Sequence, residues 1–363
     1  MATLTKSVIE TALQEVVDPN MATDLVSSKA VRNIEVDGND VTVAIRLGYP
    51  AAGYVETLKQ AVLDRLAQLD STISATLEID WEVIAHAVQP GVKILENIKN
   101  IVAVSSGKGG VGKSTTTVNL ALALAREGAR VGVLDADIYG PSQPRMLGIT
   151  ARPESTDGKS MEPLEAYGVQ AMSIGFLIDE ETPMVWRGPM VTQALEQLLR
   201  ETNWHGLDYL LIDMPPGTGD VQLTLSQKIP VSGAVIVTTP QDIALLDARK
   251  GLKMFEKVNV KVLGIVENMS THICSQCGHE EHIFGAGGGE RMAKDYGVDL
   301  LGSLPLDLSI RENADHGKPS VVADPDGAIA QSYGEIARKL AAKLALQAKD
   351  FSARFPNIVI QNT

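Results

Sequence analysis

The sequence is poor in cysteine, in long apolar runs and in basic residues, and each shortage narrows the possible functions. Only two of its 363 residues are cysteine, which favours a reducing compartment. No apolar run approaches the roughly 20 residues that a transmembrane helix needs. The formal net charge of −13 argues against a surface that coats nucleic acid, because neutralising phosphates requires clustered lysine and arginine. We therefore expect neither a membrane nor a nucleic acid as partner.

The N-terminal segment also lacks the features of an export signal. MATLTKSVIETALQEVVD contains acidic residues and no apolar signal-peptide core. Together with the low cysteine content, this predicts a cytoplasmic protein whose two thiols stay reduced and available as metal ligands. The composition, with 44% hydrophobic and 21% charged residues, is that of a folded globular chain.

A chain of this length exceeds what one hydrophobic core usually supports, so two domains are expected. VRNIEVDGNDVTVAIRL predicts a hairpin that turns at residues 37–40, and LEIDWEV alternates like a further strand. Apolar residues spaced three or four apart predict a helix with one buried face: Val55, Leu58, Val62, Leu66 and Leu69. These elements predict a small α+β domain over residues 1–88.

A break separates this domain from the rest of the chain. QPGVKILENIKN has a Pro-Gly step and no core-facing period, which predicts a linker over residues 89–99. Over residues 100–345, helical segments alternate with six apolar runs: NIVAVSS, RVGVLDAD, YLLIDMP, GAVIVTTP, KVLGIVENM and DLLGSLPLD. Such runs are typical of strands buried on both faces of a parallel sheet. We predict a doubly wound, mostly parallel α/β domain, followed by a tail over residues 346–363.

A glycine-rich loop follows the first of these strands and opens a helix. Its sequence SGKGGVGKST contains the phosphate-binding pattern G-x-x-x-x-G-K-[ST]. The glycines let backbone N–H groups surround phosphate oxygens, Lys113 is expected to reach the β- and γ-phosphates, and Ser114 to hold Mg²⁺. The predicted ATP site is made by Gly107, Lys108, Gly109, Gly110, Val111, Gly112, Lys113, Ser114 and Thr115.

The second lysine of this loop, Lys108, adds a further signature. GKGGVGKST resembles the deviant Walker A family of P-loop ATPases, which includes nitrogenase iron protein and the Par and Min partitioning ATPases. This resemblance implies that Lys108 reaches across a dimer interface to the nucleotide phosphates of the other chain. It therefore implies a homodimer when ATP is bound.

Acidic residues at the ends of two predicted strands complete the nucleotide site. VLDAD places Asp135 and Asp137 at the carboxyl end of a strand, where ligands bind in open α/β sheets. LLIDMPPGTGD places Asp213 where a Walker B carboxylate holds the metal. The family resemblance implies that Asp137 orients or activates the attacking water and that Gly217 can swing toward the γ-phosphate. A turn or helix-capping role is the alternative, above all for Asp135.

Two more polar residues, Asn268 in GIVENMS and Asp307 in LPLDLSI, end predicted strands on the same rim. Relatives use residues placed like these to contact the adenine, so the resemblance implies nucleotide contacts for both. The alternative is a capping or turn role, which is the commoner use of such residues in loops.

The two cysteines form a C-x-x-C pair, Cys274 and Cys277, in HICSQCGHEEH. A redox disulfide is disfavoured because the pair opens no obvious helix, and an inert buried role is disfavoured by its polar neighbours. Zinc remains open, because His272, His279 and His282 lie nearby and two pairs from two chains also supply four thiolates. A [4Fe-4S] cluster usually takes four thiolates too, which two copies of the chain supply across a two-fold axis.

The order of motifs identifies a narrower resemblance. SGKGGVGKST, DADIYGPS, WRGPM, DMPPGTGD, ENMS and the C-x-x-C pair closely resemble the Mrp/ApbC iron-sulfur carrier ATPases over residues 97–345. The N-terminal domain resembles the SufT-like iron-sulfur assembly proteins through VVDPN and its hairpin-helix order. Its loop LGYPAAGYVETL carries no cysteine, so partner recognition or regulation is expected of this domain rather than thiol chemistry.

The resemblance implies an ATP-hydrolysing carrier that receives a labile [4Fe-4S] cluster from cluster donors and passes it to apo-proteins. Cys274 and Cys277 of two subunits would hold this cluster, with zinc possible in its place. The implied catalytic residues are Lys108, Lys113, Asp137 and Asp213, and the implied Mg²⁺ ligands are Ser114 and Asp213.

Three alternatives stay open at this point. A partitioning or positioning ATPase would bind a membrane or nucleoid through the last predicted helix, where Ile336, Leu340 and Leu344 line one face among basic residues. The same face can instead pack on the sheet of its own domain. A zinc-bridged dimeric ATPase and a redox partner like nitrogenase iron protein are the other two.

Overall fold

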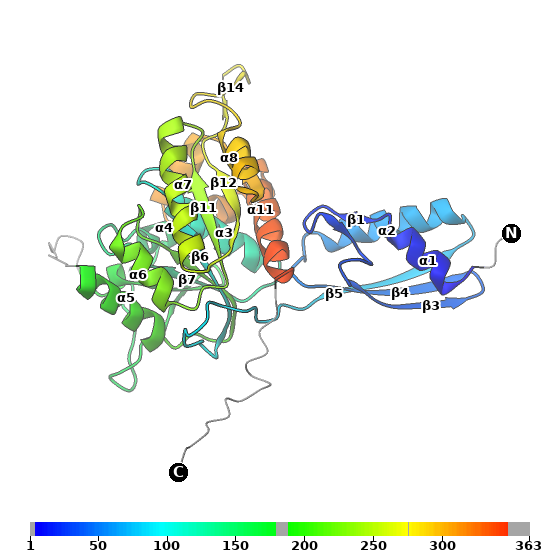
Figure 1. Cartoon of the computed structure of the whole chain (residues 1–363), viewed down its shortest axis with the longest axis horizontal. Coiled ribbons are helices and arrows are strands. Elements are labelled where there is room, and N and C mark those ends of the chain that lie inside the picture. The colour runs from blue at the N-terminus through cyan, green and yellow to red at the C-terminus, as the bar shows by residue number, and fades with distance from the viewer. Residues whose placement is uncertain (1–3, 179–187, 275, 348–363) are drawn as a thin grey trace, which may run out of the picture.

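The computed structural model describes residues 4–178, 188–274 and 276–347, which form two lobes connected by residues 82–97 (Figure 1). The N-terminal lobe comprises residues 4–81, and the larger C-terminal lobe begins at Ile98. Some residues named above lie outside the described residues: Trp186 and Arg187 of the WRGPM motif, and residues 348–363 of the predicted tail.

The N-terminal lobe is a small α+β unit built on a three-stranded sheet with the order β3–β4–β5. Strands β3 and β4 form an antiparallel hairpin, whereas β5 runs parallel to β4. Helix α2 supplies the crossover that a parallel pair requires. The elements are α1 (Lys6–Leu13), β1 (Val17–Asp18), β2 (Thr23–Asp24), β3 (Val31–Asp37), β4 (Asp40–Leu47), α2 (Val55–Leu69) and β5 (Ser74–Trp81).

The predicted helix and hairpin of this lobe are confirmed. Leu58, Val62 and Leu66 form the buried face of α2. The hairpin turns through Gly38, whose φ of +61° lies in the left-handed region that glycine adopts at little cost. Local periodicity was sufficient here because the helix and the hairpin each pack with one face against the same core.

The C-terminal lobe contains an eight-stranded sheet with the order β15–β12–β11–β6–β10–β7–β9–β8. Neighbouring strands are parallel throughout, except that β8 is antiparallel to β9. This confirms the predicted doubly wound, mostly parallel α/β class. The strands are β6 (Ile98–Ser105), β7 (Val131–Asp135), β8 (Leu164–Ala166), β9 (Val169–Ser173), β10 (Leu207–Asp213), β11 (Gly233–Thr238), β12 (Val262–Glu267) and β15 (Leu300–Ser303).

Helices cover both faces of this sheet (Figure 1). Contacts connect α3, α4, α9, α10 and α11 into one group, and α5, α6, α7 and α8 into a second group. The helices are α3 (Lys113–Arg126), α4 (Gln143–Leu147), α5 (Gly188–Glu201), α6 (Asp220–Lys228), α7 (Asp242–Lys257), α8 (Gly288–Tyr296), α9 (Leu308–Asp315), α10 (Ser320–Ala323) and α11 (Ala328–Ala345), with a 3₁₀ turn η1 (Ile174–Phe176). A short hairpin of β13 (His272–Ile273) and β14 (Glu280–Glu281) projects from the lobe at the top of Figure 1.

Helix α11 packs against its own lobe through its apolar face. Ile336, Leu340 and Leu344 are each at most 1% exposed, and α11 contacts α3, β12 and β15. The packing alternative is therefore the correct one, and the basis for a surface-binding helix is removed. Within the described part of the chain, no helix combines the length and the apolar character needed to cross a bilayer.

The far end of α3 anchors the N-terminal lobe. Glu127, which caps this helix and is 4% exposed, accepts a hydrogen bond from the N–H of Gly53 at 2.8 Å and pairs with Arg338 of α11 at 2.5 Å. The carbonyl of Glu127 accepts the N–H of Ala52, and the guanidinium of Arg338 lies 5.9 Å from the ring centre of Tyr54. One buried carboxylate thus joins two segments of the C-terminal lobe to the N-terminal lobe.

The connection between the lobes is also held. Gln89 donates to the carbonyl oxygens of Ser226 and Ile229 at 2.7 and 3.2 Å, and its own side-chain oxygen accepts the N–H of Val231. These bonds fix the segment beyond β5 on the C-terminal end of α6.

Replacing the buried carboxylate tests this arrangement. We expect Glu127→Ala to lower the free energy of unfolding by about 2–4 kcal/mol, because it leaves Arg338 and the N–H of Gly53 without their acceptor. Denaturant unfolding followed by fluorescence measures the change. Arg126→Ala is the matched control, since its ion pair with Asp326 is exposed and is expected to contribute less than about 1 kcal/mol. Equal effects of the two substitutions would contradict the anchoring role of Glu127.

Candidate functional site

The phosphate loop lies between β6 and α3, where the backbone requires glycine at two close approaches. A Cβ atom on Gly107 would lie 2.1 Å from the carbonyl carbon of Asp247 in α7. A Cβ atom on Gly112 would lie 2.1 Å from the amide nitrogen of Asn268, and Gly112 also has a φ of +81°. Gly110 has a φ of +80° with open space around it. The loop is therefore fixed by packing on one side and open on the other.

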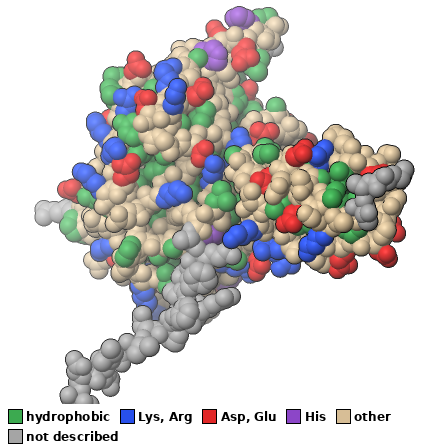
Figure 2. Space-filling view, turned by 45° about the vertical axis from the view of Figure 1, so that its right-hand side comes forward, with side chains coloured by type: hydrophobic (Ala, Val, Ile, Leu, Met, Phe, Trp, Pro, Cys, Tyr) green, Lys and Arg blue, Asp and Glu red, His purple; other side chains and the backbone are tan. Residues whose placement is uncertain are grey.

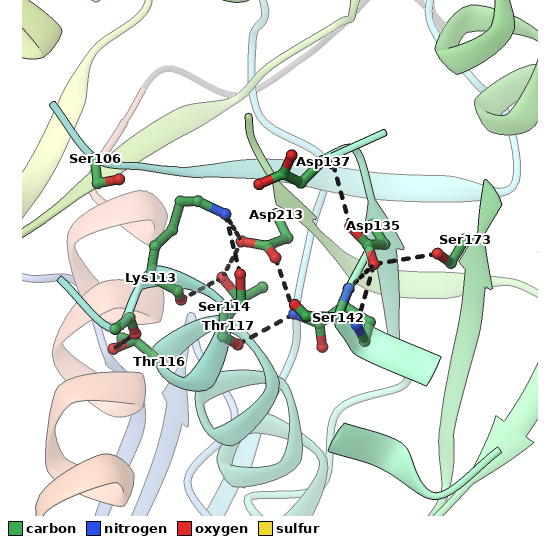
Figure 3. A network of polar contacts seen from close by, with 12 residues as sticks. Ser106, Lys113, Ser114, Thr116, Thr117, Asp135, Asp137, Ser142, Ser173 and Asp213 are labelled. Atoms are coloured by element: carbon green, nitrogen blue, oxygen red, sulfur yellow. Dashed lines mark hydrogen bonds and ion pairs between the residues drawn. The ribbon is translucent and has the colours of Figure 1, made fainter. Parts of the chain in front are cut away.

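Lys113 and Asp213 form a buried ion pair at the centre of the site (Figure 3). The Nζ atom of Lys113 lies 2.5 Å from Oδ1 of Asp213 and 3.2 Å from the hydroxyl of Ser114. The side chains of Lys113 and Asp213 are 6% and 0% exposed. The hydroxyl of Thr117 donates a further hydrogen bond to Oδ1 of Asp213 at 3.1 Å. The structure therefore places Lys113, the predicted phosphate-binding residue, beside Ser114 and Asp213, the two predicted Mg²⁺ ligands.

Gln143 is a central site residue that the sequence reasoning missed. Its side-chain nitrogen donates to Oδ2 of Asp213 at 3.0 Å and to the carbonyl of Ser114 at 3.1 Å. Its side-chain oxygen is buried and has no hydrogen-bond partner among the described residues. The sequence feature that could have identified Gln143 is its position directly after the motif DADIYGPS, at the start of α4.

Asp135 holds the loop between β7 and α4. Its Oδ2 atom accepts the N–H groups of Ser142 and Gln143 and the hydroxyl of Ser173 at 2.9, 3.1 and 3.1 Å, and Oδ1 accepts the N–H of Asp137 (Figure 3). Burial, together with the nearby charge of Asp213, raises the pKa of Asp135 to about 7. These contacts are those of the turn and capping alternative considered for Asp135.

Asp137 and Lys108 lie at the open side of the site. Asp137 is half-buried, and desolvation raises the pKa of its carboxyl group although Lys113 nearby acts in the opposite direction. The ammonium of Lys108 forms no ion pair within the described part of the chain. Its backbone carbonyl accepts the hydroxyl of Ser106 at 2.9 Å, so the loop is ordered while the lysine side chain is available.

Asn268 and Asp307 are each engaged in local contacts on the same rim. The side-chain nitrogen of Asn268 donates to the carbonyl of Val111 in the phosphate loop at 2.9 Å. Asp307 caps α9, where its Oδ1 atom accepts the N–H of Ser309 at 2.8 Å. Asn268 therefore touches the loop backbone directly, whereas Asp307 has a capping contact.

The cysteine pair lies at the tip of the β13–β14 hairpin. Cys274 is half-buried and Cys277 is exposed. The carbonyl of Cys274 accepts a hydrogen bond from the N–H of Gly278, and the N–H of Cys274 donates to the carbonyl of His279. These two bonds close the tip of the hairpin. Hydrogen bonds from the backbone N–H groups of Gln276 and Cys277 lower the pKa of the Cys274 thiol. This environment favours the thiolate, the form that binds metals.

The neighbouring histidines are oriented toward the backbone. Nδ1 of His272 lies 3.0 Å from the carbonyl oxygen of Leu306, and Nδ1 of His282 lies 2.8 Å from that of Ser270. No group of three or more His, Cys, Asp or Glu side chains that could hold a metal ion is found among the described residues. Within that part of one chain, the two-cysteine, two-histidine zinc site is not assembled.

Comparisons with known proteins agree with these features. The family model described as NUBPL iron-transfer P-loop NTPase matches residues 97–341, and that described as iron-sulfur cluster assembly protein matches residues 6–77. An iron-sulfur cluster carrier protein of Pseudomonas fragi is 64% identical over 75% of this chain and 96% of its own length. The carrier protein of Escherichia coli strain K12 is 51% identical over 91% of this chain and 89% of its own length.

Two further relatives extend the comparison to animals and to solved structures. The mouse iron-sulfur cluster transfer protein NUBPL is 54% identical over 70% of this chain and 81% of its own. A nucleotide-binding protein in complex with ADP from Archaeoglobus fulgidus is 37% identical, with a TM-score of 0.56 over 64% of this chain and 91% of that chain. The resemblance inferred from the motifs is thereby confirmed. The chain belongs to the NUBPL-type iron-transfer P-loop NTPase family, and it is an ATPase of that family preceded by an iron-sulfur cluster assembly domain.

Proposed function

We propose that this chain uses ATP hydrolysis to carry a labile [4Fe-4S] cluster, held between two subunits, to apo iron-sulfur proteins of the cytoplasm. One observation carries the proposal: a complete phosphate loop occurs in the same lobe as a pair of thiols, one half-buried and one exposed, and no group of three metal-binding side chains is found in the described part of the chain. The names of the relatives, which are carriers and transfer proteins of iron-sulfur clusters, support the choice of cargo.

ATP binding is proposed to replace the ion pair between Lys113 and Asp213. The ammonium of Lys113 turns from the carboxylate to the β- and γ-phosphates, while the loop N–H groups from Gly107 to Thr115 surround the phosphate oxygens. Asp213 then needs another cation, because a buried carboxylate without a counter-charge is costly. Before ATP binds, the ion pair thus holds in place the ammonium that would contact the phosphates and the carboxylate that would bind the metal.

The residues around Asp213 fit Mg²⁺. The hydroxyl of Ser114 and the carboxylate of Asp213 both lie within 3.2 Å of the same ammonium nitrogen, and both are the hard oxygen donors that Mg²⁺ prefers. The buried side-chain oxygen of Gln143, which has no hydrogen-bond partner among the described residues, adds an acceptor for a water molecule of that ion. When bound, Mg²⁺ would neutralise charge on the transferring phosphoryl group.

Asp137 and Lys108 are proposed to complete hydrolysis. A carboxyl group whose pKa is raised by burial can take a proton from the attacking water at neutral pH, which suits Asp137. Lys108, whose ammonium is free within the described residues, is proposed to reach the phosphates bound by a second copy of the chain. The role of Lys108 requires the loop to be accessible to a second copy, and the open space around Gly109 and Gly110 supports it.

The cluster is proposed to be cargo at the two-fold axis of a homodimer. Four thiolates are the usual ligand set of a [4Fe-4S] cluster, and Cys274 and Cys277 supply half of them. The phosphate loop is linked to this hairpin through the segment that follows β12, since Asn268 donates to the carbonyl of Val111 and the carbonyl of Ser270 lies 2.8 Å from Nδ1 of His282. A change in the loop on hydrolysis would therefore reach the hairpin by a short route.

Anaerobic reconstitution with iron and sulfide tests the cargo. We expect about four irons per two chains and a broad absorption band in the blue region, both lost in Cys274→Ala and in Cys277→Ala. His279→Ala on the same hairpin is the control and should keep the cluster, because sulfur alone is the proposed ligand. A cluster retained without either cysteine, or a colourless zinc-containing dimer, would refute the proposal.

Phosphate release measures the role of the loop lysine. We expect Lys113→Ala to lower ATP turnover by about 100-fold or more, because a group that stabilises the transferring phosphate is lost, while cluster binding is retained. The variant Lys113→Arg keeps a positive charge opposite Asp213 and so controls for loss of folding. Its ATP turnover should also fall strongly, because a planar guanidinium does not fit a site built for one ammonium. Arg126→Ala, at the far end of α3, should turn over normally. Undiminished hydrolysis in Lys113→Arg and Lys113→Ala would show that the loop has another function.

A further inference from the structure

We propose that a groove between α6 and α7 binds an acidic segment of a partner protein. The groove has a volume of ≈480 Å³ and is bordered by Thr218 and Gly219, which belong to the loop between Asp213 and α6. It is separate from the phosphate loop and from the cysteine hairpin.

Four cations from α7 line this groove: Arg249, Lys250, Lys253 and Lys257. Asp220 is the single acidic residue among the described residues that line it. The whole chain has a net charge of −13, and on the face that Figure 2 shows, acidic and basic side chains are interspersed. The groove therefore reverses the overall sign of the protein locally, which favours an anionic partner.

Two of the cations are paired only weakly. Lys250 pairs with Asp247 at 2.9 Å and Lys253 with Glu256 at 2.7 Å, in each case three residues along the same helix. Both lysine side chains are more than half exposed. Exposed pairs of this kind contribute about 0.3–0.5 kcal/mol, so a carboxylate of a partner can compete with them.

The other two cations are still less satisfied. Arg249 lies 3.9 Å from Asp295, which is beyond hydrogen-bond distance, and its buried Nε atom has no hydrogen-bond partner among the described residues. Lys257 is exposed and forms no ion pair in that part of the chain. The guanidinium of Arg249, whose side chain is 40% exposed, can therefore donate to a partner's carboxylate without giving up a close ion pair.

The spacing of the cations fits an extended polypeptide. Arg249, Lys253 and Lys257 follow one another at four-residue intervals, which corresponds to about 6 Å along a helix. In an extended chain, alternate side chains on one face are about 6.6 Å apart. Carboxylates at every second residue can therefore meet successive cations.

Apolar side chains offer contacts between the charges. Leu223 of α6, Met254 of α7 and Tyr296 of α8 also line the groove. A peptide with aliphatic residues among its acids would bury them here, whereas the phosphates and sugars of a nucleic acid gain little from such surfaces. These features favour an acidic protein segment over a nucleic acid.

A segment bound in this groove would contact the loop that leaves the nucleotide site. Thr218 and Gly219 follow Gly217, whose N–H donates to the carbonyl of Ser106 in the phosphate loop at 3.0 Å. A partner bound in the groove can therefore affect the ATPase site through this loop, without itself entering the nucleotide site.

Fluorescence anisotropy with the full chain tests this proposal. The probe is a fluorescein-labelled nonapeptide in which glutamates alternate with leucine and serine, and its counterpart has glutamine at every glutamate. We expect the glutamate peptide to bind, the glutamine peptide not to bind, and added salt to weaken binding. In Lys253→Glu/Lys257→Glu the affinity should fall by about tenfold or more, because like charges then oppose each other.

The matched control is Lys93→Glu/Lys159→Glu, which changes the net charge equally at exposed positions outside the groove. It should alter the affinity by less than about twofold. Circular dichroism checks that both variants fold, and Lys257→Gln alone, with a smaller loss of affinity, replaces the double variant if that unfolds. The proposal is overturned if the peptide does not bind, if both double variants weaken it equally, or if single-stranded DNA binds the groove more tightly than the peptide.

Discussion

The buried ion pair between Lys113 and Asp213 is the interaction on which the arrangement of the site depends. Neither charge is tolerated in the interior alone, so each is held by the other and by further hydrogen bonds. Thr117 and Gln143 supply these bonds to Asp213 from α3 and from the start of α4. The pair therefore positions three segments at once. It also sets a condition on any ligand: a group that attracts Lys113 must arrive with a cation for Asp213, as a nucleotide with its metal does.

Asp135 is a second buried carboxylate near the ion pair, and it couples the loop between β7 and α4 to the charge of Asp213. Asp135 has a pKa of about 7, raised by its burial and by the charge of Asp213, so its ionisation depends on what neutralises Asp213. Its oxygens hold the N–H groups at Ser142 and Gln143, and Gln143 in turn holds Asp213. The loop that carries Asp137 is consequently fastened to the same charges that a nucleotide would rearrange.

The sequence predicted what local pattern and short motifs encode. The six apolar runs became strands, and the phosphate loop became a glycine-rich turn between β6 and α3, because strand burial and close backbone approach leave signatures at fixed spacing. Strands β8 and β9 were missed, since they are only three and five residues long and the polar Gln170 interrupts the apolar pattern of β9. Glu127 and Gln143 were missed for another reason. Their partners lie 211 and 70 residues away along the chain, and no periodicity records such contacts.

The hairpin and the phosphate loop place a joint constraint on any homodimer. Both follow strands whose carboxyl ends lie at one edge of the sheet, because β6, β11 and β12 are mutually parallel. The nearby His272 and His282 direct Nδ1 to backbone carbonyls, and Cys274 and Cys277 are the thiolate donors of the described hairpin. Under the proposed function, a second copy would bring its sulfurs to this tip and its Lys108 to this loop. In the proposed homodimer, one two-fold axis near this sheet edge would have to serve both contacts, so closure around the nucleotide and closure around the cargo would be one movement.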